Sequence, residues 1–111
     1  ERFTPSLRDV DRPDLRDRSQ REALSNAYDN SILYTDHVLA EAIAALRATG
    51  ARATLTYVSD HGENLFDGAC PLSGHGRDTE RDFRVAAFVW HSDAWAAAHP
   101  QALAALRAHQ D

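Results

Sequence analysis

The chain has 111 residues, of which 43% are hydrophobic and 26% are charged, so it can form at most one small globular domain. Its net charge of −5 argues against a nucleic-acid-binding function, which needs a basic surface, and no apolar run approaches the ~20 residues of a membrane-spanning helix. The single cysteine, Cys70, excludes a disulfide within the chain. Because the sequence begins at Glu1 and contains no Met, we expect it to be a piece of a longer protein.

The chain is predicted to open with an irregular, charged segment. Pro5 and Pro13 interrupt any regular element there, because proline lacks the backbone N–H that helices and strands use. We therefore expect residues 1–18 to be an irregular lead-in and residues 19–111 to be the folded part.

A long helix is predicted next. Ser19 and Glu22 match the S-x-x-E pattern of a capping box, which marks a helix start. Gly50 supplies the stop signal. Between them, apolar positions recur every three or four residues, which is typical of one helical face. These positions are Leu24, Tyr28, Ile32, Thr35, Leu39, Ala42 and Leu46.

The second half of the chain predicts two strands and two short helices. Residues 53–59 are rich in β-branched and aromatic side chains, and residues 84–90 are almost continuously apolar, which favours a strand buried on both faces. About two dozen residues between them predict a long loop, of the kind that is usually functional or disordered. Ser92 is a plausible cap for one helix, and Pro100 suits the first turn of another. The order of helix, strand, long loop, strand and two helices indicates an α/β fold.

Asp60 and His61 follow the first predicted strand directly, where α/β proteins usually keep their chemistry. A carboxylate oxygen and a neutral imidazole nitrogen both bind zinc at ~2.0–2.2 Å. Gly62 lets the backbone turn sharply after them. Taken alone, this short pattern more often marks a polar turn that closes a strand. Glu63 could orient a ligand, but an exposed turn carboxylate is the better interpretation.

A second candidate is the sequence SGHGR at residues 73–77. His75 lies between two glycines, so the backbone there can approach a ligand closely, and its imidazole could bind a metal or orient a phosphoryl or sulfuryl oxygen. Arg77 could add a charge-assisted contact to the same anion. In isolation, a flexible glycine-rich surface loop is the simpler interpretation. A structural role is expected for the other histidines, His37, His91, His99 and His109.

Taken together, four segments between Ser19 and Trp95 resemble the periplasmic catalytic domain of the lipid A and lipopolysaccharide phosphoethanolamine transferases, within the alkaline phosphatase and sulfatase superfamily. They are YDNSILYTDHVL at 28–39, YVSDHGENL at 57–65, GHG at 74–76 and RVAAFVW at 84–90. The resemblance implies that residues 1–111 are the C-terminal portion of a sulfatase-type catalytic domain, a fragment of an alkaline-phosphatase-like α/β/α sandwich.

The resemblance also implies a function and a set of site residues. Asp60 and His61 match the family's adjacent zinc ligands, and His75 matches a histidine beside the substrate phosphate or a second metal. Members transfer phosphoethanolamine from phosphatidylethanolamine to lipid A or lipopolysaccharide through a threonine nucleophile. They lie in the bacterial inner membrane with the catalytic domain in the periplasm.

The matching motifs do not include that nucleophile, so we expect the fragment itself to be inactive, to bind zinc weakly or not at all, and to self-associate through uncovered sheet. The loop GACPLSGHGRDT departs from the commoner Leu-His-Gly-type loop of the family, which leaves the choice of substrate open. The alternatives are a sulfatase or phosphodiesterase of the same superfamily, and a non-catalytic binding module derived from one.

Overall fold

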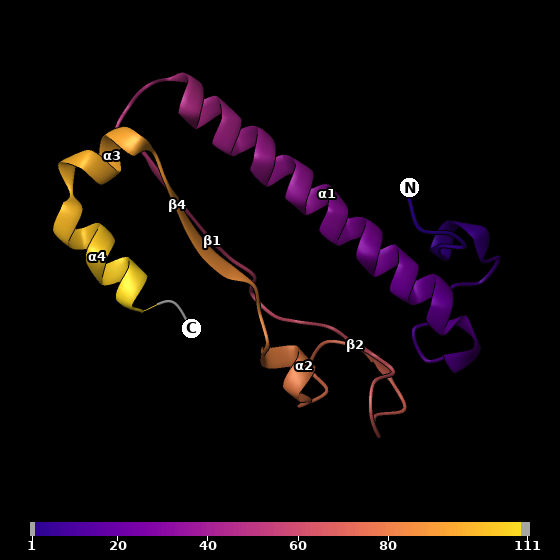
Figure 1. Cartoon of the computed structure of the whole chain (residues 1–111). Helices are drawn as coiled ribbons and strands as arrows, with labels where there is room; N and C mark the ends of the chain where they lie inside the picture. The colour runs from indigo at the N-terminus through magenta and orange to yellow at the C-terminus, as the bar shows by residue number, and fades with distance from the viewer. Residues whose placement is uncertain (1, 110–111) are drawn as a thin grey trace. The chain divides into compact units, whose positions relative to one another are not determined.

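The structure, a computed structural model, describes residues 2–109, so Glu1 of the expected lead-in lies outside it. The chain combines helices and strands, which confirms the α/β class (Figure 1). The chain packs as two units. One combines the chain up to His37 with Val58–Ala86, and the other combines Val38–Tyr57 with the chain from Ala87 onward. Within residues 2–109, no helix is both long and apolar enough to cross a bilayer.

The long helix α1 spans Arg21–Ala48. The predicted capping box at Ser19 is wrong: a 3-10 turn, η2 (Arg18–Gln20), precedes α1, and its cap is Asp17, whose carboxylate accepts the N–H of Ser19 at 2.9 Å. An ionised carboxylate is a stronger acceptor than a hydroxyl, which explains why the helical start moves upstream. The predicted stop is confirmed, because Gly50 adopts a φ of +64° and donates its N–H to the carbonyl of Arg47.

The predicted stripe of α1 mostly faces inward. Leu24 is buried, while Ile32 is exposed. The remaining stripe positions are half-buried, namely Tyr28, Thr35, Leu39, Ala42 and Leu46.

The lead-in is more ordered than its sequence suggests. It contains the 3-10 turn η1 (Leu7–Asp9). Two side chains one turn apart on α1 hold its backbone: the amide oxygen of Asn30 accepts the N–H of Phe3 at 3.1 Å, and the amide nitrogen of Asn26 donates to the carbonyl of Pro5 at 2.8 Å. Side-chain amides therefore supply the backbone partners that a helix or sheet would otherwise provide.

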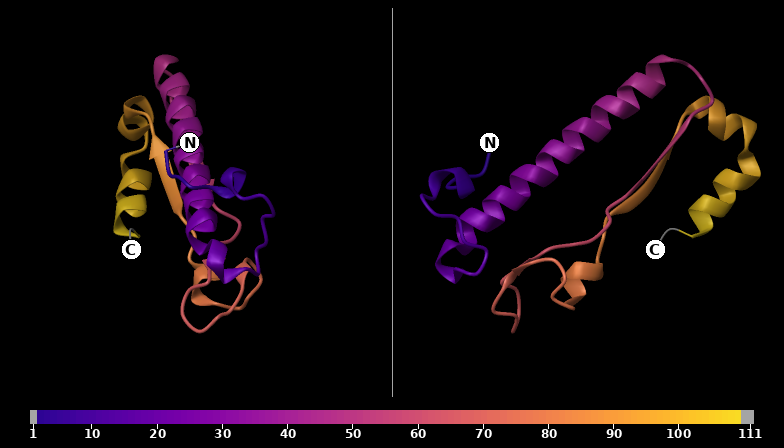
Figure 2. Two further views of the ribbon diagram at one scale, coloured as in Figure 1. Left: turned by 90° about the vertical axis from the view of Figure 1, so that its right-hand side faces the viewer. Right: turned by 180° about the vertical axis from the view of Figure 1, so that it is seen from behind.

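Strands β1 (Thr54–Val58) and β4 (Ala87–His91) form a two-stranded sheet. Hydrogen bonds at its two ends, from Ser59 N–H to Ala86 O and from Ser92 N–H to Ala53 O, show that the strands run antiparallel, as the ribbons in Figure 2 also indicate. The expectation of burial on both faces of β4 is wrong for the described residues, because a two-stranded sheet leaves Phe88 and Val89 exposed.

The C-terminal helices are confirmed. Ser92 caps α3 (Asp93–Ala98) by accepting the N–H of Trp95, and α4 (Pro100–Ala108) begins at the predicted proline. The hydroxyl of Ser92 also accepts the N–H of Ala53 at 3.0 Å and donates to the carbonyl of Ala51 at 2.9 Å, so one side chain joins the start of β1 to α3.

The expected long loop between β1 and β4 contains its own small structure. Strands β2 (Asn64–Leu65) and β3 (Ser73–Gly74) pair antiparallel, and α2 (Glu80–Phe83) follows. The fully buried Asn64 donates to the carbonyl of Leu72 at 2.7 Å, and Phe66, only 1% exposed, fills the interior. The buried Ser73 donates its N–H and its hydroxyl to the carbonyl of Leu15, which attaches the lead-in to this region.

Candidate metal centre

Asp60 and His61 lie just beyond the end of β1, as predicted. The strand ends at Val58, and the N–H of Ser59 makes the last hydrogen bond to the neighbouring chain segment, at Ala86. The hydroxyl of Ser59 then donates to the carbonyl of His61 at 2.9 Å, which fixes the turn. The two side chains therefore leave the backbone after sheet pairing has ended, where they are free to face a common ligand.

Hydrogen bonds determine which nitrogen of His61 is available. Nδ1 lies 2.9 Å from the carbonyl of Gly62, and a carbonyl only accepts, so the proton sits on Nδ1 and Nε2 keeps its lone pair. The Gly62 carbonyl raises the pKa of His61 above its ordinary value, and the negative charges of Asp60, Glu63 and Asp82 act in the same direction against the opposing effect of desolvation. His61 thus lies in a locally negative environment that favours a cation.

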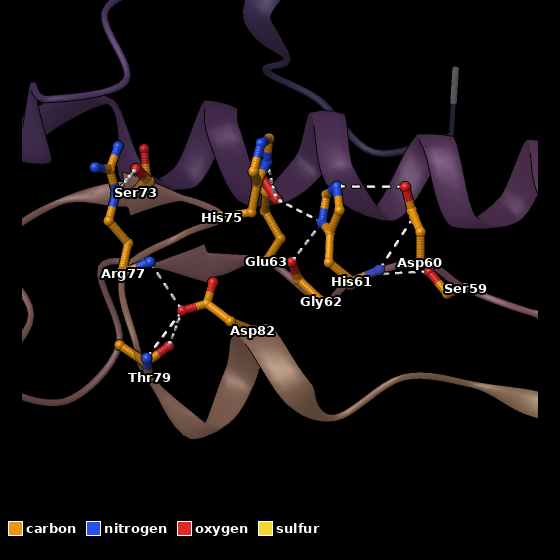
Figure 3. A network of polar contacts seen from close by, with 10 residues as sticks. All are labelled: Ser59, Asp60, His61, Gly62, Glu63, Ser73, His75, Arg77, Thr79 and Asp82. Carbon is orange, nitrogen blue, oxygen red and sulfur yellow. Dashed lines mark hydrogen bonds and ion pairs between the residues drawn. The ribbon is translucent and has the colours of Figure 1, made fainter.

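Glu63 is the centre of the group, contrary to the expectation of an exposed turn carboxylate. Its side chain is only 24% exposed, and Oε2 lies 3.4 Å from Nδ1 of His75 and 3.9 Å from Nδ1 of His61. The two imidazole rings lie with their centroids 4.1 Å apart (Figure 3). Residues 14 positions apart in sequence are thus brought together because the β2–β3 pairing folds the chain back on itself.

The loop that carries His75 is shaped by its glycines. Gly74 and Gly76 adopt φ values of +98° and +69°, which residues with a side chain rarely reach. The guanidinium of Arg77 is fixed by the bond from Nε to the carbonyl of Ser73 at 3.1 Å. In Figure 3 the guanidinium projects from the same side of the loop as the ring of His75.

Asp82 and Gly62 connect the loop that carries His61 to the loop that carries His75. Neither residue was predicted from the sequence to make this contact. The N–H of Gly62 donates to the carbonyl of Asp82 at 2.8 Å. The carboxylate oxygen Oδ2 of Asp82 accepts the N–H groups of Arg77 and Thr79, at 3.0 and 2.9 Å, and the hydroxyl of Thr79. The only sequence signal was the T-x-x-D pattern of residues 79–82, which resembles a capping box.

The donor set fits a divalent transition metal. One ligand atom each from His61, Glu63 and His75 lies within 4.8 Å of the others. Two ligand atoms at ~2.0–2.2 Å from a tetrahedral zinc are about 3.3–3.6 Å apart, and the 3.4 Å between Oε2 of Glu63 and Nδ1 of His75 fits either two such ligands or a direct carboxylate–imidazole contact. Nitrogen and carboxylate donors are also the types that zinc prefers.

Asp60 lies outside the group formed by His61, Glu63 and His75 and is far more exposed than Glu63. Its side chain is 87% exposed, and it is not one of the three residues of that group. Its Oδ2 nevertheless lies 3.7 Å from Nε2 of His61, the nitrogen with the available lone pair, so a small rotation brings both to the spacing of two zinc ligands. The structure therefore brings His61 and His75 together and leaves Asp60 at the exposed edge.

Comparison with known proteins identifies relatives. Over 80 residues the chain is 39% identical to the phosphoethanolamine transferase EptC of Escherichia coli O18:K1:H7, which covers 68% of the chain and 14% of the relative. It is 36% identical over 90 residues to the Kdo(2)-lipid A phosphoethanolamine 7''-transferase of Escherichia coli K12, which covers 78% of the chain and 16% of that protein. It is 34% identical over 80 residues to the phosphatidylethanolamine transferase Mcr-2 of Escherichia coli, covering 68% of the chain and 15% of that protein.

The chain thus spans about one seventh of the length of these curated relatives. No solved structure matches it. The family model of the sulfatases matches residues 1–111. The chain belongs to the sulfatase family.

Proposed function

We propose that this chain is the C-terminal part of the catalytic domain of a metal-dependent transferase, which moves phosphoethanolamine from phosphatidylethanolamine to lipid A or lipopolysaccharide. The observation that carries the proposal is the cluster of His61, Glu63 and His75 at the end of β1, beside Asp60, in a member of the sulfatase family. The names of the relatives, all phosphoethanolamine or phosphatidylethanolamine transferases, support the choice of reaction.

Zinc is the proposed metal, and Asp60 and His61 are its proposed ligands. His61 offers Nε2, because its Nδ1–H is occupied by the carbonyl of Gly62, and Asp60 offers Oδ2 at 3.7 Å from that nitrogen. When bound, zinc would neutralise charge on the phosphoryl oxygens and lower the pKa of a hydroxyl nucleophile. The remaining ligands and the threonine nucleophile would come from other parts of the parent protein.

His75 is the proposed contact to the phosphoryl group. Its Nδ1 faces Oε2 of Glu63 at 3.4 Å, so the carboxylate holds the ring and directs Nε2 outward. Arg77, fixed by Ser73, would add a charge-assisted contact to the same anion from two residues further along.

A pocket of about 250 Å³ next to Glu63 supports a zwitterionic substrate. Its walls carry both carboxylates and guanidinium groups, and an aromatic ring. A phosphoethanolamine headgroup bears one cationic and one anionic end, so it complements such a mixed lining. The lining residues are Tyr28, Asp29, Gly62, Glu63, Leu65, Asp67, Arg81 and Arg84.

The parent protein is proposed to lie in the bacterial inner membrane with this domain in the periplasm, where its lipid substrates are. Nucleic acid is not expected to be a partner. The isolated chain is proposed to lack turnover and to bind zinc weakly, since two ligands leave the ion largely hydrated. The second candidate is a sulfatase, which would use the same residues to act on a sulfate ester. Membership of the sulfatase family supports this candidate.

The test is turnover of phosphatidylethanolamine by the full-length protein with three single substitutions. We expect Asp60→Ala and His61→Ala to remove nearly all activity, and His75→Ala to impair turnover while sparing much of the metal binding. Wild-type turnover in Asp60→Ala would refute its assignment as a zinc ligand. Hydrolysis of an aryl sulfate, without transfer from phosphatidylethanolamine, would favour the sulfatase alternative.

A further inference from the structure

Among residues 2–109, Asp82 is the one buried carboxylate, and it contacts both loops of the candidate metal centre. The residue is only 6% exposed. Its carbonyl accepts the N–H of Gly62, the residue between His61 and Glu63, and its carboxylate accepts the N–H of Arg77, two residues after His75. Asp82 therefore sits where it can influence each member of the group.

One oxygen of this carboxylate has no partner among the described residues. Oδ2 accepts three hydrogen bonds, two from Thr79 and one from Arg77, while the buried Oδ1 accepts none. A buried carboxylate oxygen without a partner is costly, and native structures usually compensate it with a ligand, an ion or water. Figure 3 shows Oδ1 directed away from the Thr79 donors, toward the side of the loop where Glu63 and His75 lie.

We propose that Asp82 is a positioning residue whose buried negative charge strengthens the binding of a divalent cation at His61. This inference rests on the proposed metal function of the same site. The carboxylate is not one of the grouped ligand residues, so it would act through the electric field at the cation and through a hydrogen bond from water or ligand to Oδ1. Partners of this kind typically change metal affinity by about 10–100-fold.

The charge and the hydrogen bonds of Asp82 can be separated by substitution. Asp82→Asn keeps the shape of the side chain, and its amide oxygen can still accept the three bonds from Arg77 and Thr79, while the NH₂ group replaces Oδ1 and the charge is lost. Thr79→Val is the matched control, because it removes one of the three donors to Oδ2 and leaves the charge in place.

The measurement is zinc affinity of the full-length protein, by competition with a chromophoric chelator after removal of metal. Hydrogen exchange of residues 73–83 reports whether the loop keeps its structure. We expect Asp82→Asn to weaken zinc binding by about tenfold or more while residues 73–83 stay folded, and Thr79→Val to change zinc binding by less than about threefold. Wild-type affinity in Asp82→Asn would overturn the proposal.

Two further variants keep the test decisive. If Asp82→Asn does not fold, Asp82→Glu is measured, which keeps the charge: affinity within about threefold of wild type supports the proposal, and a loss of tenfold or more contradicts it. His61→Ala distinguishes failure of the Asp82 proposal from failure of the metal site itself. If it abolishes zinc binding while Asp82→Asn does not affect it, the inference fails alone, whereas wild-type zinc binding in His61→Ala would make the metal function fail as well.

Discussion

At the residue scale, the site depends on how closely the His61 loop packs against α2. Gly62 has no room for a side chain: a Cβ placed there would lie 1.8 Å from the carbonyl oxygen of Arg81, which is backbone and cannot swing away. The same close approach allows the N–H of Gly62 to reach the carbonyl of Asp82 at 2.8 Å. Gly62 is thus required by packing, and not only by the turn.

Gly62→Ala should therefore push α2 away from the His61 loop. We expect a loss of about 1–3 kcal/mol in the free energy of unfolding, together with weaker zinc binding by the full-length protein. The control is Gly68→Ala, because a Cβ at Gly68 meets nothing within 4 Å and the substitution brings only the strain of a φ of +59°. Wild-type zinc affinity in Gly62→Ala, measured by chelator competition, would show that the close packing does not position the ligands.

Asp82 gives the loop a pH dependence. Hydrogen bonds from Thr79, aided by Arg77, lower the pKa of Asp82 below its ordinary value of 3.8, against the effect of burial. A lowered folded-state pKa stabilises the fold at pH values above 3.8, and that contribution is lost as the pH falls through the lower folded-state value.

Protection of residues 73–83 against hydrogen exchange, corrected for the intrinsic rate, should thus fall as the pH decreases below 3.8. In Asp82→Asn this fall should be absent or smaller, because the group that titrates is gone. An identical pH profile in the two proteins would contradict the role assigned to this carboxylate.

At the element scale, the strands and helices of the second unit are joined through Ser92. Its hydroxyl accepts the N–H of Ala53 and the N–H of Trp95, and it donates to the carbonyl of Ala51. The Ser92 side chain therefore caps α3 and also hydrogen-bonds the backbone just before β1. Because Ser92 is buried, water could not easily replace its hydroxyl as the hydrogen-bond partner of these backbone groups.

Ser92→Ala should destabilise the protein by about 1–3 kcal/mol, since it removes a helix cap and leaves a buried N–H group without a partner. Thermal unfolding of the full-length protein measures the effect. Ser31→Ala is the control, because its hydroxyl only donates back to the carbonyl of Tyr28 within α1, and it should change stability by less than about 0.5 kcal/mol. Equal effects of the two substitutions would argue against a joining role for Ser92.

The elements that could be predicted from sequence are those with a local signal. The stripe from Leu24 to Leu46 gave α1, and Ser92 and Pro100 marked the starts of α3 and α4. The small structure between β1 and β4 was missed, because β2 and β3 have two residues each and therefore no period to detect. They are held by Asn64 and by burial of Phe66, which only the folded chain reveals.

In the candidate site, too, only the residues with a local sequence pattern could be predicted. The placement of Asp60 and His61 followed from the strand that precedes them, since a ligand pair after a strand is a local pattern. The participation of Glu63 was not predictable, because its burial depends on the approach of His75 through the β2–β3 pairing. The contribution of Asp82 depends in the same way on contacts with two loops that are distant in sequence.

At the scale of the whole molecule, the chain leaves apolar sheet surface uncovered. Val58, Phe88 and Val89 of β1 and β4 are exposed in the described part of the chain. A two-stranded sheet also presents unpaired backbone groups along its outer edges, which invite pairing with another chain. Both features point to association with further protein, either other parts of the parent or a second copy.

We therefore expect the isolated chain to self-associate, as measured by sedimentation velocity over a range of concentrations. Val89→Lys should shift the distribution toward the monomer, because a charged side chain on the strand opposes both apolar contact and edge pairing. Val38→Lys, at an exposed position of α1, serves as the control and should leave association unchanged. A monomer at every concentration would contradict the expectation.

If His61 binds zinc in the protein that carries this chain, the metal content of that full-length protein depends on this side chain. Zinc should be measured by mass spectrometry after purification, for the wild type, for His61→Ala and for His37→Ala, an exposed histidine on α1 outside the cluster. We expect wild-type zinc in His37→Ala and nearly complete loss in His61→Ala. Wild-type zinc content in His61→Ala would contradict it.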